Sequence, residues 1–232
     1  MVEIKGLEKF ASKDFPGYIS STVFLGGCNF KCPYCHNSDL VLRPQALPDI
    51  PWGDFVNFLD ERINWLEGVC VSGGEPLLEK NLKELVRAIK DRNFLVKLDT
   101  NGSFPEKLEE LVQERLVDSI AMDIKAPLER YQKVTNSGVD ETRIARSVEI
   151  IKSSGLEYVF RTTVVPGLVD ADDIEKIGRM LGKAQVFQIQ QFSPINTLDP
   201  GFLQKKPFSR EEILKMAEIA KPYFSEVRVE GV

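Results

Sequence analysis

Three cysteines near the N-terminus are the residues with the clearest capacity for chemistry. Cys28, Cys32 and Cys35 form a C-x3-C-x2-C pattern, the fourth cysteine is Cys70, and the one histidine, His36, follows the cluster directly. Three thiolates this close together can converge on one metal centre. A chain with one histidine cannot build a His-rich metal site, and it offers little for a Ser-His-Asp triad.

Several kinds of site could use these thiols. A structural zinc site takes four protein ligands, usually as two C-x-x-C pairs, and this sequence has no second pair. A [4Fe–4S] cluster held by three thiolates suits the pattern better, because its fourth iron stays open to a small molecule. Three unrelated thiols are the remaining alternative. We interpret Cys70 as a core thiol that packs like a small apolar side chain, and His36 as a loop residue rather than a ligand or base.

Further polar residues follow the expected strands. The segment SGGEP follows an apolar strand at 68–72, and its Gly73 and Gly74 would let the backbone approach a ligand while Glu75 supplies a carboxylate. An ordinary strand-to-helix turn, with proline in the first helical turn, is the alternative for this segment.

Two aspartates mark the ends of neighbouring strands. Asp99 and Thr100 follow a strand at 94–99, and Asp123 and Lys125 end a strand at 117–124. Carboxylates placed together repel each other unless a cation lies between them, and either Lys125 or a bound ion could be that cation. A simple surface ion pair is the alternative. A third charge, Arg161, lies inside the apolar strand LEYVFRTTVV and must face either solvent or a functional interior.

The elements that would position these residues alternate between strand and helix. Expected strands are 18–25, 68–72, 94–99, 117–124, 156–165 and 185–192, with amphipathic helices between them. Ser209 and Glu212 form a capping box for a last helix, and 226–229 reads as a short strand. This alternation predicts an α/β fold of parallel strands with right-handed crossovers. Six units fit a partial barrel or an open doubly wound sheet, because an eight-unit barrel needs about 250 residues.

Composition limits the broad class of the protein. The chain has 232 residues, of which 43% are hydrophobic, and no Gly-, Pro- or Ser-rich linker, so we expect one domain over 1–232 with a core at about 18–194 and a C-terminal helix and strand at 209–230. The net charge of −5, with both signs interspersed, argues against nucleic-acid binding. No apolar run approaches the roughly 20 residues that span a bilayer, so we expect no membrane partner and a soluble intracellular protein.

The cysteine segment resembles a known family. Residues 24–37 (FLGGCNFKCPYCHN), with DFPG at 14–17, are similar to the radical S-adenosylmethionine (SAM) superfamily and, within it, to the glycyl-radical-enzyme activases. Within that group the match is greatest to the activating protein of anaerobic ribonucleoside-triphosphate reductase. The resemblance runs over about residues 4–194. It implies a partial (β/α)6 TIM-like barrel with parallel strands and outer helices.

The resemblance also implies a chemistry. Cys28, Cys32 and Cys35 would hold one [4Fe–4S] cluster, and SAM would bind its open iron. An electron from ferredoxin or flavodoxin would then cleave SAM to a 5′-deoxyadenosyl radical, which removes hydrogen from a glycine of the partner, here anaerobic ribonucleotide reductase. Only Cys70 remains, so no second cluster can form. Because such a cluster is oxygen-labile, we expect a reducing cytoplasm.

Residue roles follow from the same resemblance. Gly73, Gly74 and Glu75 would bind the SAM amino group, and Asp99, Thr100 and Asp123 would hold a monovalent cation beside the SAM carboxylate. The further SAM contacts would be Tyr34, Lys125, Arg161 and Val164, with Val164 against the adenine. Asn196 stands where some members carry a histidine that contacts SAM, which leaves open the contact from the last core strand.

Other functions remain as alternatives. A small-molecule radical SAM enzyme, such as a 7-carboxy-7-deazaguanine synthase, would share the fold and cluster, but its third cysteine is typically followed by Ser or Thr, which serves a magnesium ion, where this chain has His36. An activase of another protein is a second alternative. A zinc-stabilised binding module without catalysis is a third.

Overall fold

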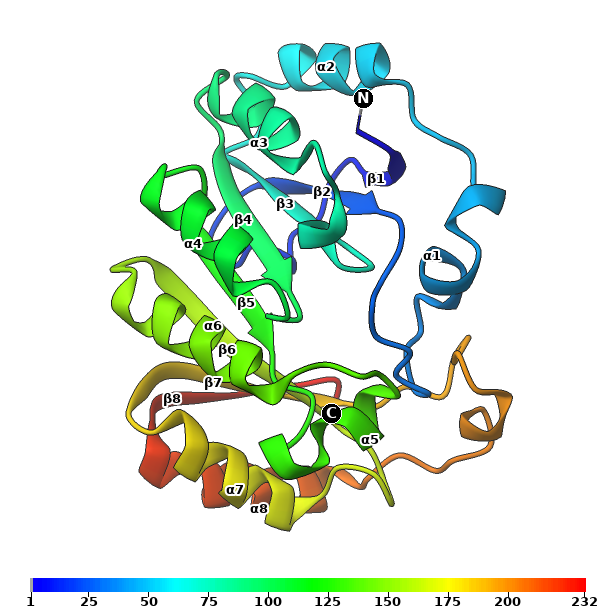
Figure 1. Ribbon diagram of the computed structural model, residues 1–232, viewed down its shortest axis with the longest axis vertical. Helices are drawn as coiled ribbons and strands as arrows, with labels where there is room; N and C mark the ends of the chain where they lie inside the picture. The colour runs from blue at the N-terminus through cyan, green and yellow to red at the C-terminus, as the bar shows by residue number, and fades with distance from the viewer. Residues whose placement is uncertain (1) are drawn as a thin grey trace.

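The computed structural model describes residues 2–232, and its strands form one curved sheet (Figure 1). The strands lie side by side in chain order: β1 Ile4–Glu8, β2 Ser20–Leu25, β3 Gly68–Gly73, β4 Leu95–Thr100, β5 Ser119–Asp123, β6 Glu157–Val164, β7 Ala184–Gln191 and β8 Phe224–Glu230. β1 pairs antiparallel with β2, and every later pair is parallel. The predicted partial barrel of parallel strands is confirmed, with β1 and β8 added at its edges.

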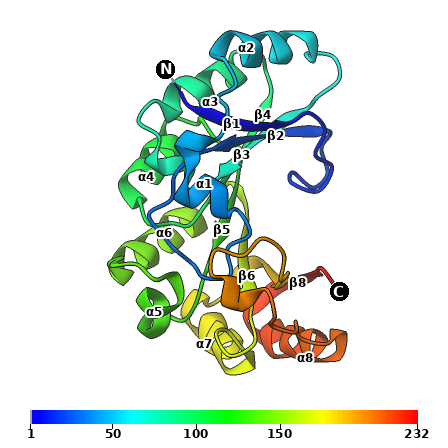
Figure 2. The same ribbon diagram turned by 90° about the vertical axis from the view of Figure 1, so that its right-hand side faces the viewer.

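The helices lie mainly on the outer face of the sheet, and α1 stands apart from the others at the right of Figure 1 (Figures 1 and 2). They are α1 Ser38–Leu42, α2 Trp52–Glu61, α3 Leu82–Lys90, α4 Pro105–Gln113, α5 Tyr131–Thr135, α6 Glu141–Ser153, α7 Ala171–Leu181 and α8 Arg210–Ala220. Leu82, Leu85, Val86 and Ile89 of α3 show the principle, since their spacing puts all four on one buried face. Apolar packing of this kind fixes the longer helices, and therefore the loops that join them to the strand ends.

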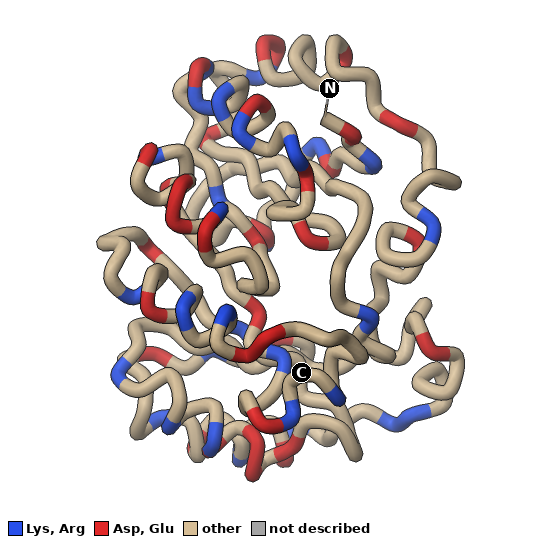
Figure 3. Tube along the Cα trace, in the orientation of Figure 1, with Lys and Arg blue, Asp and Glu red and all other residues tan. Residues whose placement is uncertain are grey.

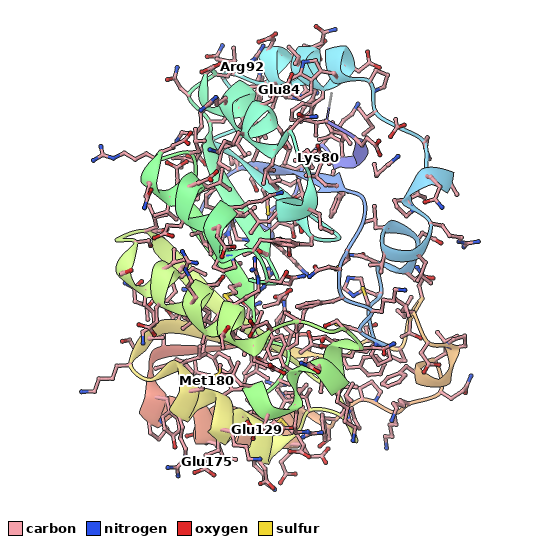
Figure 4. All side chains as sticks on the ribbon, in the orientation of Figure 1. Lys80, Glu84, Arg92, Glu129, Glu175 and Met180 are labelled. Atoms are coloured by element: carbon pink, nitrogen blue, oxygen red, sulfur yellow. The ribbon has the colours of Figure 1, made fainter. Side chains whose placement is uncertain are left out.

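The outer helices carry charges of both signs (Figure 3). Arg146 of α6 reaches Glu106 and Glu109 of α4 at 3.0 and 2.8 Å. Glu84 of α3 and Glu175 of α7 also lie on this outer layer (Figure 4). Such exposed pairs contribute little stability, and they surround the fold without entering its interior.

The inner face of the sheet is polar, unlike the packed apolar core of a closed barrel. Because side chains alternate along a strand, Cys70 and Ser72 of β3 share this face, as do Lys97 and Asp99 of β4. Lys97 is 3% exposed, which is rare for a lysine unless it is paired. The inner face of the sheet therefore accommodates charged side chains.

The start of α8 agrees with the start predicted from the sequence. Ser209 caps α8 and forms the predicted capping box with Glu212, because each side chain meets the other's backbone N–H. Three elements were not predicted: β1, a short edge strand with little periodicity, and the short helices α1 and α5. Within residues 2–232, no helix is both long enough and apolar enough to cross a membrane.

Candidate functional site

A cavity of about 600 Å³ opens at the carboxyl ends of the parallel strands, and we call it the central cavity. In open parallel sheets this edge is where ligands bind. Eleven of the residues assigned to the site from sequence line it: Cys28, Cys32, Tyr34, Cys35, Gly73, Gly74, Asp99, Thr100, Asp123, Lys125 and Arg161. His36 lines it as well. The fold thus brings the cysteines and the charged strand ends together.

Three distant segments hold the cysteine loop, residues 26–36, in place. The Gly27 N–H donates to the carbonyl of Leu40, before the end of α1, at 2.8 Å. The Lys31 N–H donates to the carbonyl of Thr135 in α5, also at 2.8 Å. The Cys35 carbonyl accepts from the Leu198 N–H at 2.9 Å. Backbone hydrogen bonds from both sides fix where the thiols lie.

The thiols of this loop are sheltered from water. Burial raises the pKa of Cys28 to about 11 and that of Cys32 to about 12. Both would therefore be neutral at pH 7 unless bound metal stabilised the thiolates. No three Cys, His, Asp or Glu side chains in residues 2–232 gather closely enough to hold a single metal ion. Three thiols on one loop, all lining one cavity, fit a cluster whose cysteines bind separate irons.

Five side chains, of which Lys97 is buried and the others are partly buried, form what we call the charge network: Lys97, Asp99, Asp123, Lys125 and Arg161. Arg161 lies between the two carboxylates, with Nε 2.8 Å from Asp123 Oδ1 and Nη1 3.1 Å from Asp99 Oδ2. Lys125 Nζ lies 3.0 Å from the other oxygen of Asp123, and Lys97 pairs with Asp99. The network therefore runs across β4, β5 and β6 with alternating sign.

The charge network keeps its two carboxylates ionised. Burial alone would raise the pKa of Asp99 and Asp123, but Arg161 and the lysines hold both below the ordinary value. Burial would likewise lower the pKa of Lys125, and Asp123 raises it well above normal. Lys125 and Arg161 are the two cations that line the central cavity. They offer positive charge to a ligand carboxylate, although the lining acids Asp14, Asp99, Asp123 and Glu230 outnumber them.

The expected monovalent cation is not needed to separate the two carboxylates. The sequence placed that ion among Asp99, Thr100 and Asp123, and the structure places the Arg161 guanidinium between the two aspartates. The cation stays a prediction. The arginine supplies the positive charge that the clustered carboxylates require.

The paired glycines are required by the close approach of two loops. A Cβ on Gly74 would lie 1.9 Å from the Gly27 carbonyl oxygen, and Gly73 has φ of +122° with a Cβ position 2.3 Å from the Leu25 oxygen. The end of β3 can therefore pack directly on the start of the cysteine loop. Both glycines also line the central cavity.

Glu75 does not lie in the lining of the central cavity, and its contact with the SAM amino group stays a prediction. Its carboxylate is buried and accepts from Leu77 N–H at 3.0 Å, Thr100 Oγ1 at 2.8 Å and Asn101 N–H at 2.6 Å. Burial raises its pKa to about 7. Glu75 thus ties the end of β3 to the end of β4, beneath the residues that line the cavity.

Val164 is also absent from the central cavity lining. It is fully buried in the core, while Thr163 and Arg161 on the same strand line the cavity. Strand alternation explains the difference, because neighbouring residues point to opposite faces. Thr163 occupies the inner position, and the adenine contact of Val164 stays a prediction.

The remaining assignments concern residues around the cysteine loop. Cys70 is fully buried, as predicted, and its Sγ lies 3.7 Å from Lys97 Nζ. Asn196 does not line the central cavity; its Nδ2 donates to the His36 carbonyl at 3.1 Å, and its Oδ1 accepts from Ser38 Oγ at 3.4 Å. Asn196 therefore supports the loop rather than replacing a SAM-contacting histidine.

Sequence reasoning missed two residues of the site. Lys97 stands inside the apolar strand FLVKLD, and the same signal that singled out Arg161 could have found it. Asn101 Nδ2 lies 3.8 Å from Cys28 Sγ and donates to Asn29 Oδ1 at 3.0 Å. An Asn-Gly pair also signals an ordinary turn, so no local pattern identifies that contact.

Comparison with known proteins places this geometry in context. Residues 22–181 match the family described as the radical SAM superfamily. A Methanocaldococcus jannaschii protein, provisionally named a glycyl-radical enzyme activating enzyme, is 33% identical over 238 residues, which cover 99% of this chain and 96% of its own. The pyruvate formate-lyase-activating enzyme of Streptococcus mutans is 29% identical over 208 residues, covering 84% of this chain and 78% of its own.

Solved structures share the fold. Streptococcus suis SuiB bound to S-adenosylmethionine superposes with a TM-score of 0.66 at 16% identity, over 88% of this chain and 48% of that one. The native anSMEcpe structure with bound AdoMet gives 0.58 at 17% identity, over 88% and 61%. Since the family match and the 33% identical relative each span most of the sequence, the chain belongs to the radical SAM superfamily.

Proposed function

We propose that this radical SAM enzyme is an activase that generates a glycyl radical on a partner enzyme, and that the partner is anaerobic ribonucleoside-triphosphate reductase. The observation that carries the proposal is the central cavity, where three thiols of one loop lie in the same lining as two paired cations, Lys125 and Arg161. The end-to-end similarity to a relative named as an activating enzyme supports the same reading. The partner follows from the cysteine segment at 24–37 and the DFPG segment.

Each part of the cavity has a role in this proposal. Cys28, Cys32 and Cys35 would hold the [4Fe–4S] cluster through their thiolates. Lys125 and the Arg161 guanidinium would attract and orient the SAM carboxylate, and Asp99 and Asp123 keep these two cations fixed. When bound, the cluster and SAM supply a 5′-deoxyadenosyl radical that takes hydrogen from a glycine Cα. Reduced ferredoxin or flavodoxin would provide the electron.

Anaerobic reconstitution tests the function. The cluster-loaded protein is mixed with SAM, a reductant and a candidate reductase, and a glycyl-radical doublet is sought by electron paramagnetic resonance. We expect the doublet with the reductase and none without SAM. Cleavage of SAM to 5′-deoxyadenosine with no doublet on any candidate partner would refute the activase proposal and favour a small-molecule substrate.

Cysteine variants provide the matched control. Replacing Cys28, Cys32 or Cys35 with Ala should abolish cluster assembly, because each supplies one ligand. Cys70→Ala should leave the iron content unchanged, because Cys70 is buried beside Lys97 on the inner face of the sheet and does not line the central cavity. Loss of iron in the Cys70 variant would show that the ligand set is wrong.

A further inference from the structure

The cysteine loop forms part of the outer surface of the protein as well as part of the central cavity. Asn29, Lys31 and His36 are exposed, and each stands next to one of the three cysteines in the chain. Cys28 and Cys35 are themselves only partly buried. The thiols therefore lie close beneath the outer surface of this loop. Because electron transfer slows steeply with distance, this surface gives a donor protein the shortest approach to a cluster held by the loop.

Two other segments extend this surface. Helix α5 and the orange segment at 195–206 lie on either side of the cysteine loop (Figure 1). The Lys31 N–H binds α5, as described above, and the Asp199 N–H donates to the Pro33 carbonyl at 2.9 Å. Farther along the same segment, Lys205 Nζ donates to a carbonyl just after the end of β6 at 3.1 Å. These hydrogen bonds hold the loop and both segments together as one surface.

Positive charge without a carboxylate partner gathers on this surface. Within residues 2–232, three of its lysines form no ion pair, and we call them the lysine face: Lys31, Lys133 and Lys205. Basic side chains elsewhere on the outer layer commonly pair with acids, as between α4 and α6. The acid of the 195–206 segment, Asp199, accepts a backbone N–H with its carboxylate. In a chain with a net charge of −5, such a local group of cations favours an acidic partner.

Exposed apolar side chains lie on the same segment as Lys205. Ile195 is 70% exposed and Leu203 is 41% exposed. Asn196, the residue after Ile195, donates to the His36 carbonyl, so this apolar surface adjoins the cysteine loop. Protein interfaces typically combine apolar contacts at the centre with a polar rim. The lysine face and these two side chains together have that composition.

We propose that the lysine face, with Ile195 and Leu203, is the docking surface for an acidic one-electron carrier protein. The inference rests on the cluster of the proposed function. In the step that follows docking, the carrier loses one electron and the cluster gains it, and no atom is transferred. A glycine of a partner enzyme would have to enter the central cavity, whereas an electron donor needs only the surface outside the thiols. This difference favours the donor as the occupant.

The test measures the binding of oxidised flavodoxin, an acidic carrier, to the cluster-loaded protein by anaerobic isothermal titration calorimetry. The double variant Lys31→Glu/Lys133→Glu should bind at least about tenfold more weakly than the natural protein, because two attractive charges become repulsive. The control Lys9→Glu/Lys183→Glu makes the same change in net charge and should bind within about twofold of the natural protein. Both control residues lie at the opposite end of the sheet, since Lys9 follows the antiparallel β1 and Lys183 precedes β7.

A second measurement separates docking from damage to the cluster. Reduced flavodoxin should reduce the cluster at least about tenfold more slowly in Lys31→Glu/Lys133→Glu than in the natural protein, followed by stopped-flow absorbance. Dithionite, a small anion that needs no docking surface, should reduce the cluster in all three proteins. Iron content should also be the same in all three, because the hydrogen bond of Lys31 to α5 comes from its backbone.

Three outcomes would overturn the inference. Equal weakening in both double variants would mean that net charge, and not the lysine face, attracts the carrier. A flavodoxin dissociation constant of the natural protein that stays the same between about 0.05 and 0.5 M salt would overturn it without any variant. Unchanged flavodoxin binding with weakened binding of a reductase in Lys31→Glu/Lys133→Glu would assign the surface to the partner enzyme instead. Absence of iron after reconstitution of the natural protein would refute the proposed function itself, which separates the two conclusions.

Discussion

The charge network shows how single residues decide the chemistry of this cavity. Lys97, Asp99, Asp123, Lys125 and Arg161 are all withdrawn from solvent, and each contacts an opposite charge. Removing one partner from a buried pair leaves an uncompensated charge, which is far more costly than losing a surface pair. The network is thus both a binding surface and a condition for the fold.

The position of Arg161 leads to a prediction about ions. Because its guanidinium already joins Asp99 and Asp123, SAM binding should not require a monovalent cation. Replacing potassium by tetramethylammonium should change the SAM dissociation constant by less than about twofold, measured by dialysis. Arg161→Gln should introduce ion dependence, since the two carboxylates would then lack the charge between them. A strong potassium requirement in the natural protein would restore the cation site.

Glu75 predicts a pH dependence of stability. Its pKa is raised to about 7 in the fold, above its ordinary value of 4.5, because its carboxyl is buried. The folded state therefore holds the proton more tightly than the unfolded state. This contribution to the free energy of unfolding is fully present below pH 4.5. It is lost as the pH rises through 7, and the free energy of unfolding then falls by about 3 kcal/mol.

The measurement is urea unfolding between pH 5 and pH 8 under anaerobic conditions. In Glu75→Gln the side chain cannot ionise, so the loss of stability over this range should be smaller than in the natural protein. Glu84→Gln, an exposed acid on α3, serves as the matched control and should keep the natural pH profile. Identical profiles for all three proteins would contradict the raised pKa.

At the scale of elements, the cysteine loop depends on α5 more than its own sequence suggests. Phe30 packs edge-on against Tyr131, with ring centroids 6.1 Å apart, and the neighbouring Lys31 N–H binds Thr135. Tyr131 in turn donates from its hydroxyl to the Asp123 carbonyl at 3.2 Å. A short helix that no periodicity marks therefore connects the thiols to the charge network.

Phe30→Leu should reduce cluster content more than it reduces stability. The smaller side chain loses the contact with Tyr131, so the loop can move while the sheet stays packed. Phe94→Leu, a similarly buried residue beside β4, is the matched control and should lower the urea midpoint without lowering iron content. Iron per protein after anaerobic reconstitution measures the first effect. Equal iron in the two variants would contradict this role of Phe30.

Elements and strand ends could be predicted from sequence because they depend on local periodicity and capping. The strand holding Arg161, the helix cap at Ser209 and the cysteine loop all follow from nearby residues. The surroundings of Glu75 and Val164 could not be predicted in the same way. The carboxylate of Glu75 is captured by Thr100 and Asn101, a contact across the sheet, and the face of Val164 depends on strand register.

At the scale of the whole molecule, buried and exposed ion pairs contribute differently to stability. The inner face is open along its length: a lower cavity of about 740 Å³ shares Asp14, Arg161, Gln190 and Glu230 with the central cavity. The outer layer is joined by exposed ion pairs between helices, as between α4 and α6. Stability therefore depends more on the buried pairs than on the more numerous exposed ones.

Two arginines test this difference. Arg130 lies 2.5 Å from Asp173, whose side chain is 2% exposed at the start of α7. Arg130→Ala should cost about 3 kcal/mol, because it leaves a buried carboxylate unpaired. Arg146→Ala removes pairs with half-exposed partners on α4 and should cost less than about 1 kcal/mol. Urea unfolding compares the two, and equal losses would contradict the distinction.

The strict chain order of the strands has a consequence for how the protein is made. The strands lie in the sheet in chain order, and the residues that line the central cavity extend from Asp14 to Gly231. The wall around the cysteine loop is therefore complete only after nearly all of these residues have been synthesised. A cluster delivered to the nascent chain would bind while the sheet still lacks its C-terminal strands. It would then be exposed to oxygen on the side where those strands are missing. We therefore expect cluster delivery to follow translation.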